Sequence, residues 1–184
     1  MDNGASSYRR FLDGDDNGLA EIISFYNDGL TLYLNSFVNN LSIADELSED
    51  IFVKIGLKKP RFSGKSSFKT WLYAIGRNVA IDFMRRSPKH AIISLDDCAE
   101  QADEETIERQ FLKEEQKIIL HKAMNKLKPE YRQVLWLIYF EELSAKETAK
   151  IMKKSVHSIE NLVSRARQSL KSQLKQEGFV YENL

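Results

Sequence analysis

Apolar residues recur every three or four positions along most of the chain, which is the spacing of amphipathic helices. The clearest run covers residues 19–37 and predicts one long helix. Gly29 lies inside this run, where glycine costs about 1 kcal/mol relative to alanine. No segment alternates apolar and polar residues with a period of two. The pattern therefore predicts an all-α fold.

Two more helices are predicted in the first half of the chain, at about residues 42–57 and 66–86. Ser42 is the expected N-cap of the first, because a serine side chain can accept a hydrogen bond from the first helical turn. Ser66 or Ser67 is the expected N-cap of the second. Each of these helices ends close to a proline, which disfavours helix continuation.

The second half of the chain is also punctuated by helix-start signals. Pro129 suits the first turn of a helix, and Ser144 suits an N-cap position. A short helix starts at Ser144, residues 153–155 form a turn, and a last helix follows, which gives helix-turn-helix proportions. The expected helices cover about residues 108–127, 129–140, 144–152 and 156–174.

The total charge is zero, with 27 basic and 27 acidic residues, but the charge is unevenly distributed. Residues 1–87 are neutral, residues 88–112 carry a net charge of −5, and residues 113–184 carry a net charge of +5. This distribution predicts two small helical domains joined by an acidic linker. The helix-turn-helix belongs to the C-terminal domain.

The chain carries few residues suited to cofactor chemistry. The single cysteine, Cys98, excludes an internal disulfide, and the three histidines have no metal-ligand spacing, so we expect no metal and no other cofactor. The N-terminus lacks an apolar signal segment, and the longest apolar run, Val134–Phe140, is far shorter than the ~20 residues of a membrane span. These features predict a cytoplasmic protein without membrane insertion.

A small polar loop precedes the helix predicted over residues 66–86, and this helix mixes aromatic with basic residues. Unstacked bases need aromatic faces and hydrogen-bonding groups, and phosphates need fixed positive charge. The segment therefore suits single-stranded nucleic acid. We expect Phe68 and Leu72 in the core together with Ile75 and Val79. Trp71 and Tyr73 are equally suited to packing and to stacking on a base.

The last predicted helix has one apolar stripe and one polar face. The stripe contains Val156, Ile159, Val163, Ala166 and Leu170. Polar and basic side chains on the second helix of a helix-turn-helix can contact base edges and phosphates in the major groove. The alternative is a three-helix packing unit with a solvated face. The candidate DNA contacts are His157, Ser158, Glu160, Asn161, Ser164, Arg165 and Arg167.

The helix predicted over residues 42–57 carries four carboxylates in its first half. Asp45 and Glu49, like Glu46 and Asp50, are like charges at spacing i,i+4, which destabilises an isolated helix by roughly 0.2–0.5 kcal/mol per pair. Such a face is better tolerated opposite a basic partner. A solvated acidic face is the simpler alternative.

Taken in order, three segments resemble the extracytoplasmic-function (ECF) group of bacterial RNA polymerase sigma factors. They are Ala44–Phe52, the stretch from Phe62 through Asp82, and the stretch from Leu127 through Arg167. The similarity extends from about residue 19 to residue 174. It implies a transcription initiation factor that is not an enzyme, with core RNA polymerase and promoter DNA as partners, and it also implies an anti-sigma factor.

The resemblance also implies a role for each segment. The acidic helix is expected to bind core polymerase, with the coiled coil of the beta-prime subunit as its docking site and the beta subunit as a further partner. The helix-turn-helix residues named above are expected to read the minus-35 element. The polymerase-binding candidates are Asp45, Glu46, Glu49, Asp50 and Phe52. The minus-10 candidates are Lys65, Ser66, Ser67, Lys69, Trp71, Tyr73, Arg77, Asn78, Arg85 and Arg86.

Several residues depart from the family pattern. Glu160 and Leu162 occupy positions that are usually basic in the family, which predicts fewer phosphate contacts. Ser48 and Gly56 depart from the usual docking helix. Two other functions remain open: a stand-alone helix-turn-helix regulator, which would bind duplex DNA without polymerase, and a metal-dependent enzyme acting through the four carboxylates.

Overall fold

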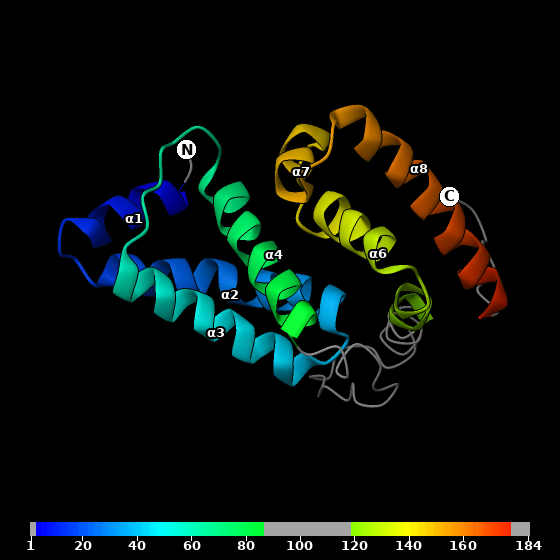
Figure 1. Ribbon diagram of the computed structural model, residues 1–184, viewed down its shortest axis with the longest axis horizontal. Coiled ribbons are helices and arrows are strands. Elements are labelled where there is room, and N and C mark those ends of the chain that lie inside the picture. The colour runs from blue at the N-terminus through cyan, green and yellow to red at the C-terminus, as the bar shows by residue number, and fades with distance from the viewer. Residues whose placement is uncertain (1–2, 87–118, 178–184) are drawn as a thin grey trace, which may run out of the picture.

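The computed structural model describes residues 3–86 and 119–177, and all regular secondary structure in these ranges is helical (Figure 1). The all-α prediction is confirmed. The predicted acidic linker, residues 88–112, lies outside the described ranges. Among the described helices, none has the length and apolar character required to cross a membrane.

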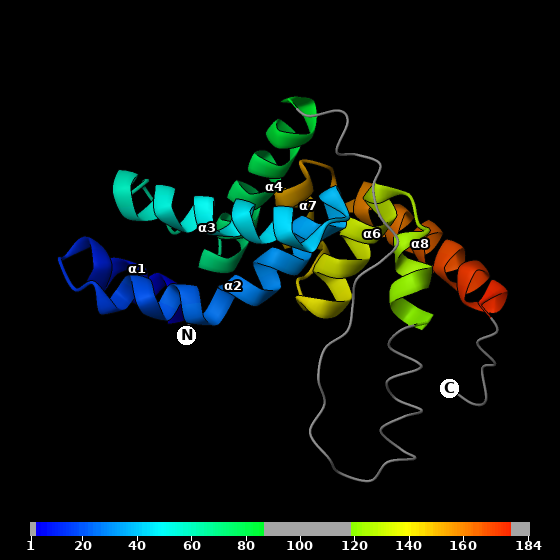
Figure 2. The same ribbon diagram turned by 90° about the horizontal axis from the view of Figure 1, so that it is seen from below.

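Three helices of the N-terminal half lie where the hydrophobic pattern predicts them. They are α2 (Asn17–Val38), α3 (Leu41–Lys58) and α4 (Phe68–Arg86). The first two form a hairpin, and α4 packs against both of them (Figure 2). The expected long helix is continuous through Gly29.

The turn between α2 and α3 corrects one prediction. Asn39 adopts a left-handed conformation with φ 49°, and the side chain of Asn40 accepts a hydrogen bond from the backbone nitrogen of Ile43 at 3.1 Å. The N-cap of α3 is therefore Asn40 and not Ser42. Asparagine is as good an N-cap as serine, and it tolerates the left-handed region better than most residues.

Helix α1 (Asn3–Leu12) was not predicted, because it contributes only two large buried apolar side chains, Tyr8 and Phe11. Tyr8 packs against the rings of Phe68 and Trp71, with centroid distances of 5.5 and 5.4 Å, and its hydroxyl donates to the backbone oxygen of Pro60. The helix packs mainly on α2, and Tyr8 ties it to α4 and the loop before α4.

The C-terminal half begins, in the described chain, with helical residues 119–125 and continues with α6 (Pro129–Leu135). The helix expected to continue to Phe140 is present, but its last turn, η2 (Trp136–Phe140), is a π-helix. The backbone nitrogen of Glu141 donates to the Trp136 oxygen at 3.1 Å, which is the i→i+5 bond of this wider turn.

Helices α7 (Ala145–Met152) and α8 (Val156–Gln176) form the predicted helix-turn-helix. Ser144 is the N-cap of α7, as expected, and completes a capping box with Glu147. Lys153 ends α7 in the left-handed conformation with φ 54°.

The buried face of α8 differs from the predicted stripe by one residue at its start. Ile159 and Ala166 are fully buried as expected, but Val156 is 40% exposed, and Leu162 is buried. Burial gives Leu162 a packing role, so its apolar character does not indicate a lost phosphate contact at the surface.

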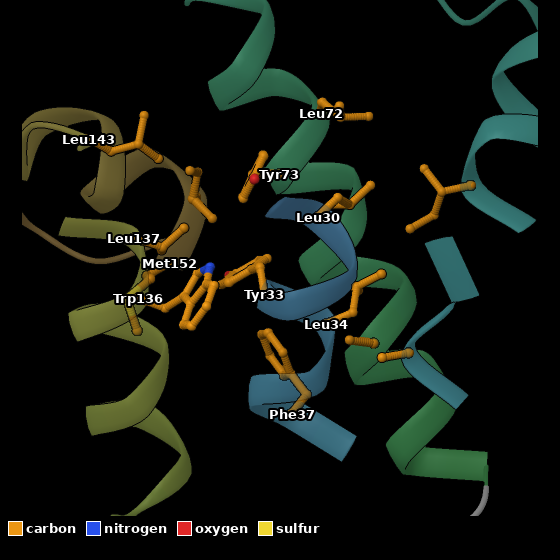
Figure 3. Packing of buried hydrophobic residues seen from close by; sticks show 14 of the residues in the cluster. Leu30, Tyr33, Leu34, Phe37, Leu72, Tyr73, Trp136, Leu137, Leu143 and Met152 are labelled. Carbon is orange, nitrogen blue, oxygen red and sulfur yellow. The ribbon is translucent and has the colours of Figure 1, made fainter. Parts of the chain in front are cut away.

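One hydrophobic core continues through both halves of the molecule. Figure 3 shows side chains of α2 and α4 facing residues that follow position 135, and α4 packs directly against α7. Tyr33 and Tyr73 are fully buried at this junction, opposite Trp136, Leu137 and Met152. The two predicted helical units therefore share an apolar interface in this structure.

Candidate nucleic-acid and polymerase interfaces

The loop before α4 is fixed by a helix cap. The Ser67 hydroxyl accepts a hydrogen bond from the Thr70 backbone nitrogen at 3.2 Å, which makes Ser67 the cap that the sequence left open between two serines. Gly64 has φ 69°, a conformation that glycine adopts without strain. Lys65 is exposed, and Ser66 is half-buried beside it.

Most polar minus-10 candidates on α4 lie at its surface. Asn78, Arg85 and Arg86 are exposed, whereas Lys69 and Arg77 are half-buried. Because Asn78 and Arg85 are seven residues apart, they lie on the same face of the helix. The surface of α4 thus offers an amide and several cations along its length.

The aromatic residues of this segment serve mainly as core. Phe68 and Leu72 are fully buried, as expected, and Tyr73 is fully buried as well. The structure therefore corrects the expectation that Tyr73 could stack on a base. Trp71 is half-buried among aromatic rings that include Phe62, at a centroid distance of 5.4 Å, and it keeps part of its ring at the surface.

The acidic face of α3 is open. Asp45, Glu46, Glu49 and Asp50 are all exposed, and Asp50 makes an ion pair of 3.7 Å with Lys54. The face is a row of carboxylates at the start of the helix, available to a basic partner.

Phe52 does not belong to that face. It is only 4% exposed and packs in the core, which corrects its assignment as a polymerase contact. On the same side as Asp50, α3 exposes the apolar side chains of Val53, at 57%, and Leu57, at 80%. Their spacing of three and seven residues from Asp50 could have identified them, since these spacings lie on one helical face.

All seven DNA candidates on α8 are exposed, so this helix presents one polar surface. The Asn161 amide and the His157 ring are 3.0 Å apart, and Arg165 donates to the Asn161 backbone oxygen at 3.3 Å. The Arg167 guanidinium lies over the ring of Tyr139 at 6.0 Å.

Side chains of the C-terminal half contact several minus-10 candidates directly. The Ser67 hydroxyl donates to Glu147 Oε1 at 3.1 Å, and Lys69 Nζ lies 2.8 Å from Glu141 Oε2. Lys153 Nζ donates to Asn78 Oδ1 at 3.0 Å. The α4 surface is therefore engaged by α7 and by the turn that precedes it.

Comparison with known proteins covers both halves of the chain. Residues 26–89 match Sigma-70 region 2, and residues 117–170 match Sigma-70, region 4. The ECF RNA polymerase sigma factor SigM of Bacillus subtilis (strain 168) is 30% identical over 152 residues, which are 83% of this chain and 92% of that protein. The chain belongs to the ECF group of RNA polymerase sigma factors.

Two further relatives agree with this assignment. The RNA polymerase sigma factor YlaC of the same B. subtilis strain is 31% identical over 81% of this chain and 87% of its own length. The solved structure of the sigma factor RpoE from Bartonella quintana, in complex with the anti-sigma factor NepR, covers 85% of this chain and 96% of that chain. Its TM-score is 0.67 at 24% identity, which shows a shared fold.

The family assignment confirms the resemblance drawn from the three sequence segments. Sigma factors are transcription initiation factors and not enzymes, in agreement with the expectation for this chain. In the described residues, no cluster of three or more His, Cys, Asp or Glu side chains could hold a metal ion. The region 2 match contains α3 and α4, and the region 4 match contains α7 and most of α8.

The junction between regions 2 and 4 of this sigma factor perturbs several ionisable groups. Burial, together with the neighbouring Glu141 carboxylate, raises the pKa of Tyr73. Burial lowers the pKa of Arg132, whose guanidinium donates to the Ser36 backbone oxygen at 2.9 Å. Hydrogen bonds from Ser144 are the main reason that the pKa of Glu147 is lowered.

Proposed function

We propose that this sigma factor divides its work among three helices. The exposed acidic face of α3 binds core RNA polymerase, the exposed face of α8 reads the minus-35 element, and α4 with its preceding loop captures unpaired bases of the minus-10 element. The observation that carries the proposal is the presence of both sigma regions in one chain, with an exposed row of carboxylates on α3. This work takes place in the cytoplasm, where core polymerase acts.

For polymerase docking, the four carboxylates of α3 supply negative charge and Val53 with Leu57 supply an apolar edge. Exposed charges of one sign steer a partner of opposite sign, and apolar side chains beside them add buried area. A basic, partly apolar surface on the beta-prime subunit has the complementary chemistry.

For promoter recognition, α8 supplies hydrogen-bonding side chains that suit major-groove edges and arginines that suit phosphates. Asn161 and Arg165 are the central candidates because both are exposed on consecutive turns of the helix. For opening of the minus-10 element, Asn78 offers an amide to an unstacked base. Lys69 and Arg77 offer positive charge to the phosphates of the DNA strand.

Reconstituted transcription tests this division. Added to core polymerase, the protein is expected to direct transcripts from specific start sites, and Asp50→Arg is expected to reduce them because the substitution places a cation on the docking face. Asp13→Arg is the matched control, since Asp13 is exposed but lies outside both matched regions. Equal transcription with both variants, or specific transcripts without any sigma factor, would contradict the proposal.

An anti-sigma factor is part of the same proposal. Two exposed apolar side chains of the N-terminal half, Phe25 at 60% and Leu57 at 80%, support such a partner because each has much apolar area to bury. Affinity purification from the native cell, followed by competition of the purified partner against core polymerase, tests it. A partner that binds without inhibiting transcription would contradict this part.

A further inference from the structure

The junction between the two halves uses charged and polar groups at defined places. Glu141 is only 9% exposed, and its carboxylate lies 2.8 Å from Lys69 Nζ and accepts a hydrogen bond from Trp136 Nε1 at 3.2 Å. The backbone oxygen of Glu141 accepts a second bond from Lys69 Nζ at 2.9 Å. A buried carboxylate is tolerated only with such partners, so this set of contacts is specific.

Gly29 shows that α2 accommodates this carboxylate. A Cβ atom at position 29 would lie 2.7 Å from Glu141 Oε1 and 2.6 Å from the Tyr73 hydroxyl oxygen. Both distances are too short for a side chain. The glycine that weakens the long helix locally is thus the residue that lets Glu141 of the C-terminal half approach the α2 backbone.

A second carboxylate lies at the N-terminus of α4. Glu147 Oε1 accepts hydrogen bonds from the hydroxyls of Ser67 at 3.1 Å and Thr70 at 3.3 Å, while its Oε2 belongs to the capping box of α7. The N-terminal end of a helix attracts negative charge, whether the charge comes from a carboxylate or a phosphate. Glu147 therefore occupies a position that suits a DNA phosphate.

Basic side chains of the C-terminal half complete the contact. Lys150 Nζ donates a hydrogen bond to the Lys65 backbone oxygen at 3.1 Å, and Lys153 Nζ donates one to Asn78 Oδ1. At the other end of the junction, the buried Arg132 guanidinium donates to the backbone at the C-terminal end of α2, where positive charge is favoured.

We propose that region 4 inhibits region 2 within the same chain. Glu141 and Glu147 hold Lys69 and Ser67, so that the minus-10 surface at the N-terminal end of α4 is occupied until the two regions separate. This inference rests on the minus-10 role proposed above for α4. It assigns a regulatory function to two carboxylates that lie outside the proposed DNA- and polymerase-binding residues.

The consequence for binding is a competition for the same side chains. A promoter strand that uses Lys69, Ser67 and Asn78 has to displace Glu141, Glu147 and Lys153. The apparent affinity of the free protein for this strand is therefore reduced by the fraction of molecules in which region 4 is docked. Separation of the regions restores the intrinsic affinity.

Glu141→Lys is the opening variant, designed to separate the two regions. It places a second ammonium group next to Lys69, and repulsion between the two cations is expected to expel the side chain at position 141 from the junction. The matched control is Glu142→Lys, because Glu142 is the exposed neighbour and the change in charge is identical. Gly29→Ala is a second, independent opening variant, since its methyl group takes the space of the Glu141 carboxylate. Circular dichroism with thermal melting verifies that each variant is folded.

Two measurements on the full chain test the inference. With Trp71→Phe as background, Trp136 is the remaining tryptophan, and its emission is expected to shift to the red in both opening variants as the ring becomes hydrated. Binding to a bubble template, made from a promoter mapped with the wild-type holoenzyme, is measured by anisotropy without core polymerase and without the Trp71→Phe change. Both opening variants are expected to bind the template about tenfold more tightly than wild type, whereas Glu142→Lys is expected to bind it with wild-type affinity.

Three results would overturn the inference: no red shift in either opening variant, a red shift without tighter binding, or an equal effect of Glu142→Lys. Failure of the proposed function gives a different result, because the wild-type holoenzyme then produces no specific transcripts. In that case the red shift still reports separation of the two regions, and the masking role falls together with the minus-10 role.

Discussion

Helices α3 and α4 belong to the same region of this sigma factor, but their functional faces differ in accessibility. The carboxylates of α3 are exposed, and the ion pair with Lys54 comes from the same helix. Lys69 and Asn78 of α4, together with the N-cap Ser67, instead contact side chains of the C-terminal half. The proposed polymerase-binding face is thus open, whereas part of the proposed minus-10 face is occupied by the same chain.

This difference in exposure indicates that, in the proposed function, polymerase binding precedes binding of the minus-10 element. A chain whose proposed docking face is open and whose proposed minus-10 face is partly occupied can bind polymerase first and DNA afterwards. Binding to polymerase would then favour the separated arrangement, because only a differential affinity for the two arrangements can shift their equilibrium.

The largest expected effect comes from the apolar contact that covers α4. Tyr73→Ala removes a fully buried ring between the halves and is expected to lower the free energy of unfolding by about 3–5 kcal/mol. Leu57→Ala, on the open face of α3, is expected to change it by less than about 0.5 kcal/mol. Urea denaturation measures both, and similar losses would show that the two faces do not differ in packing.

A smaller effect is expected on the open face. Glu46→Arg replaces an exposed carboxylate and is expected to weaken binding to core polymerase by roughly tenfold, about 1.4 kcal/mol, at low salt. The difference from wild type is expected to shrink as salt rises, since exposed charges are screened. Competition for core enzyme at several salt concentrations measures it, and a salt-independent loss would indicate a structural defect instead.

On the covered face, Glu147 predicts a dependence on pH. Its pKa is lowered in the folded protein from the usual 4.5, chiefly by hydrogen bonds from Ser144. Its contribution to stability is therefore complete above the usual pKa and is lost as the pH falls through the lowered one.

Glu147→Gln removes this titration. We expect the variant to be less stable than wild type by about 1 kcal/mol or less at pH 7, and the difference to narrow as the pH falls toward 3. Unfolding free energies between pH 3 and pH 7 measure the trend. A difference that widened at low pH would contradict the lowered pKa.

The smallest expected effect concerns the ion pair within α3. Both partners are mostly exposed, so Lys54→Ala is expected to change the free energy of unfolding by less than about 0.5 kcal/mol. The substitution also leaves Asp50 unpaired, and slightly tighter binding to core polymerase is expected. Binding that weakened after this change would show that Lys54 itself contacts the polymerase.

Local signals predicted most of the helices. Capping by Ser67 and Ser144, and Pro129 in the first turn of α6, gave boundaries close to those observed. Such signals depend on neighbouring residues and can be read from a single sequence. Helix α1 has few of them, because Tyr8 and Phe11 are its two large buried side chains and they pack on residues far along the chain.

The candidate sites were predicted by residue type but less well by orientation. Phe52 and Tyr73 were given surface roles, and Leu162 was placed at a position that is usually basic, yet all three are buried. Periodicity locates a face only to within about one residue, and a second helix packed on the far side changes which face is covered. Contacts such as Lys69 with Glu141, 72 residues apart, arise from this packing and leave no local signal.

The π-turn Trp136–Phe140 gives Glu141 its position, because one additional residue in the turn shifts everything that follows around the helix axis. Deletion of one residue there would restore an α-turn and rotate the next side chain by about 100°, away from Lys69. A change of a single codon can thus separate a sigma factor whose proposed minus-10 surface is masked from one in which that surface is always accessible. Insertion or loss of that codon is a simple route by which related chains could gain or lose the proposed self-inhibition without changing any residue of the proposed DNA- and polymerase-binding faces.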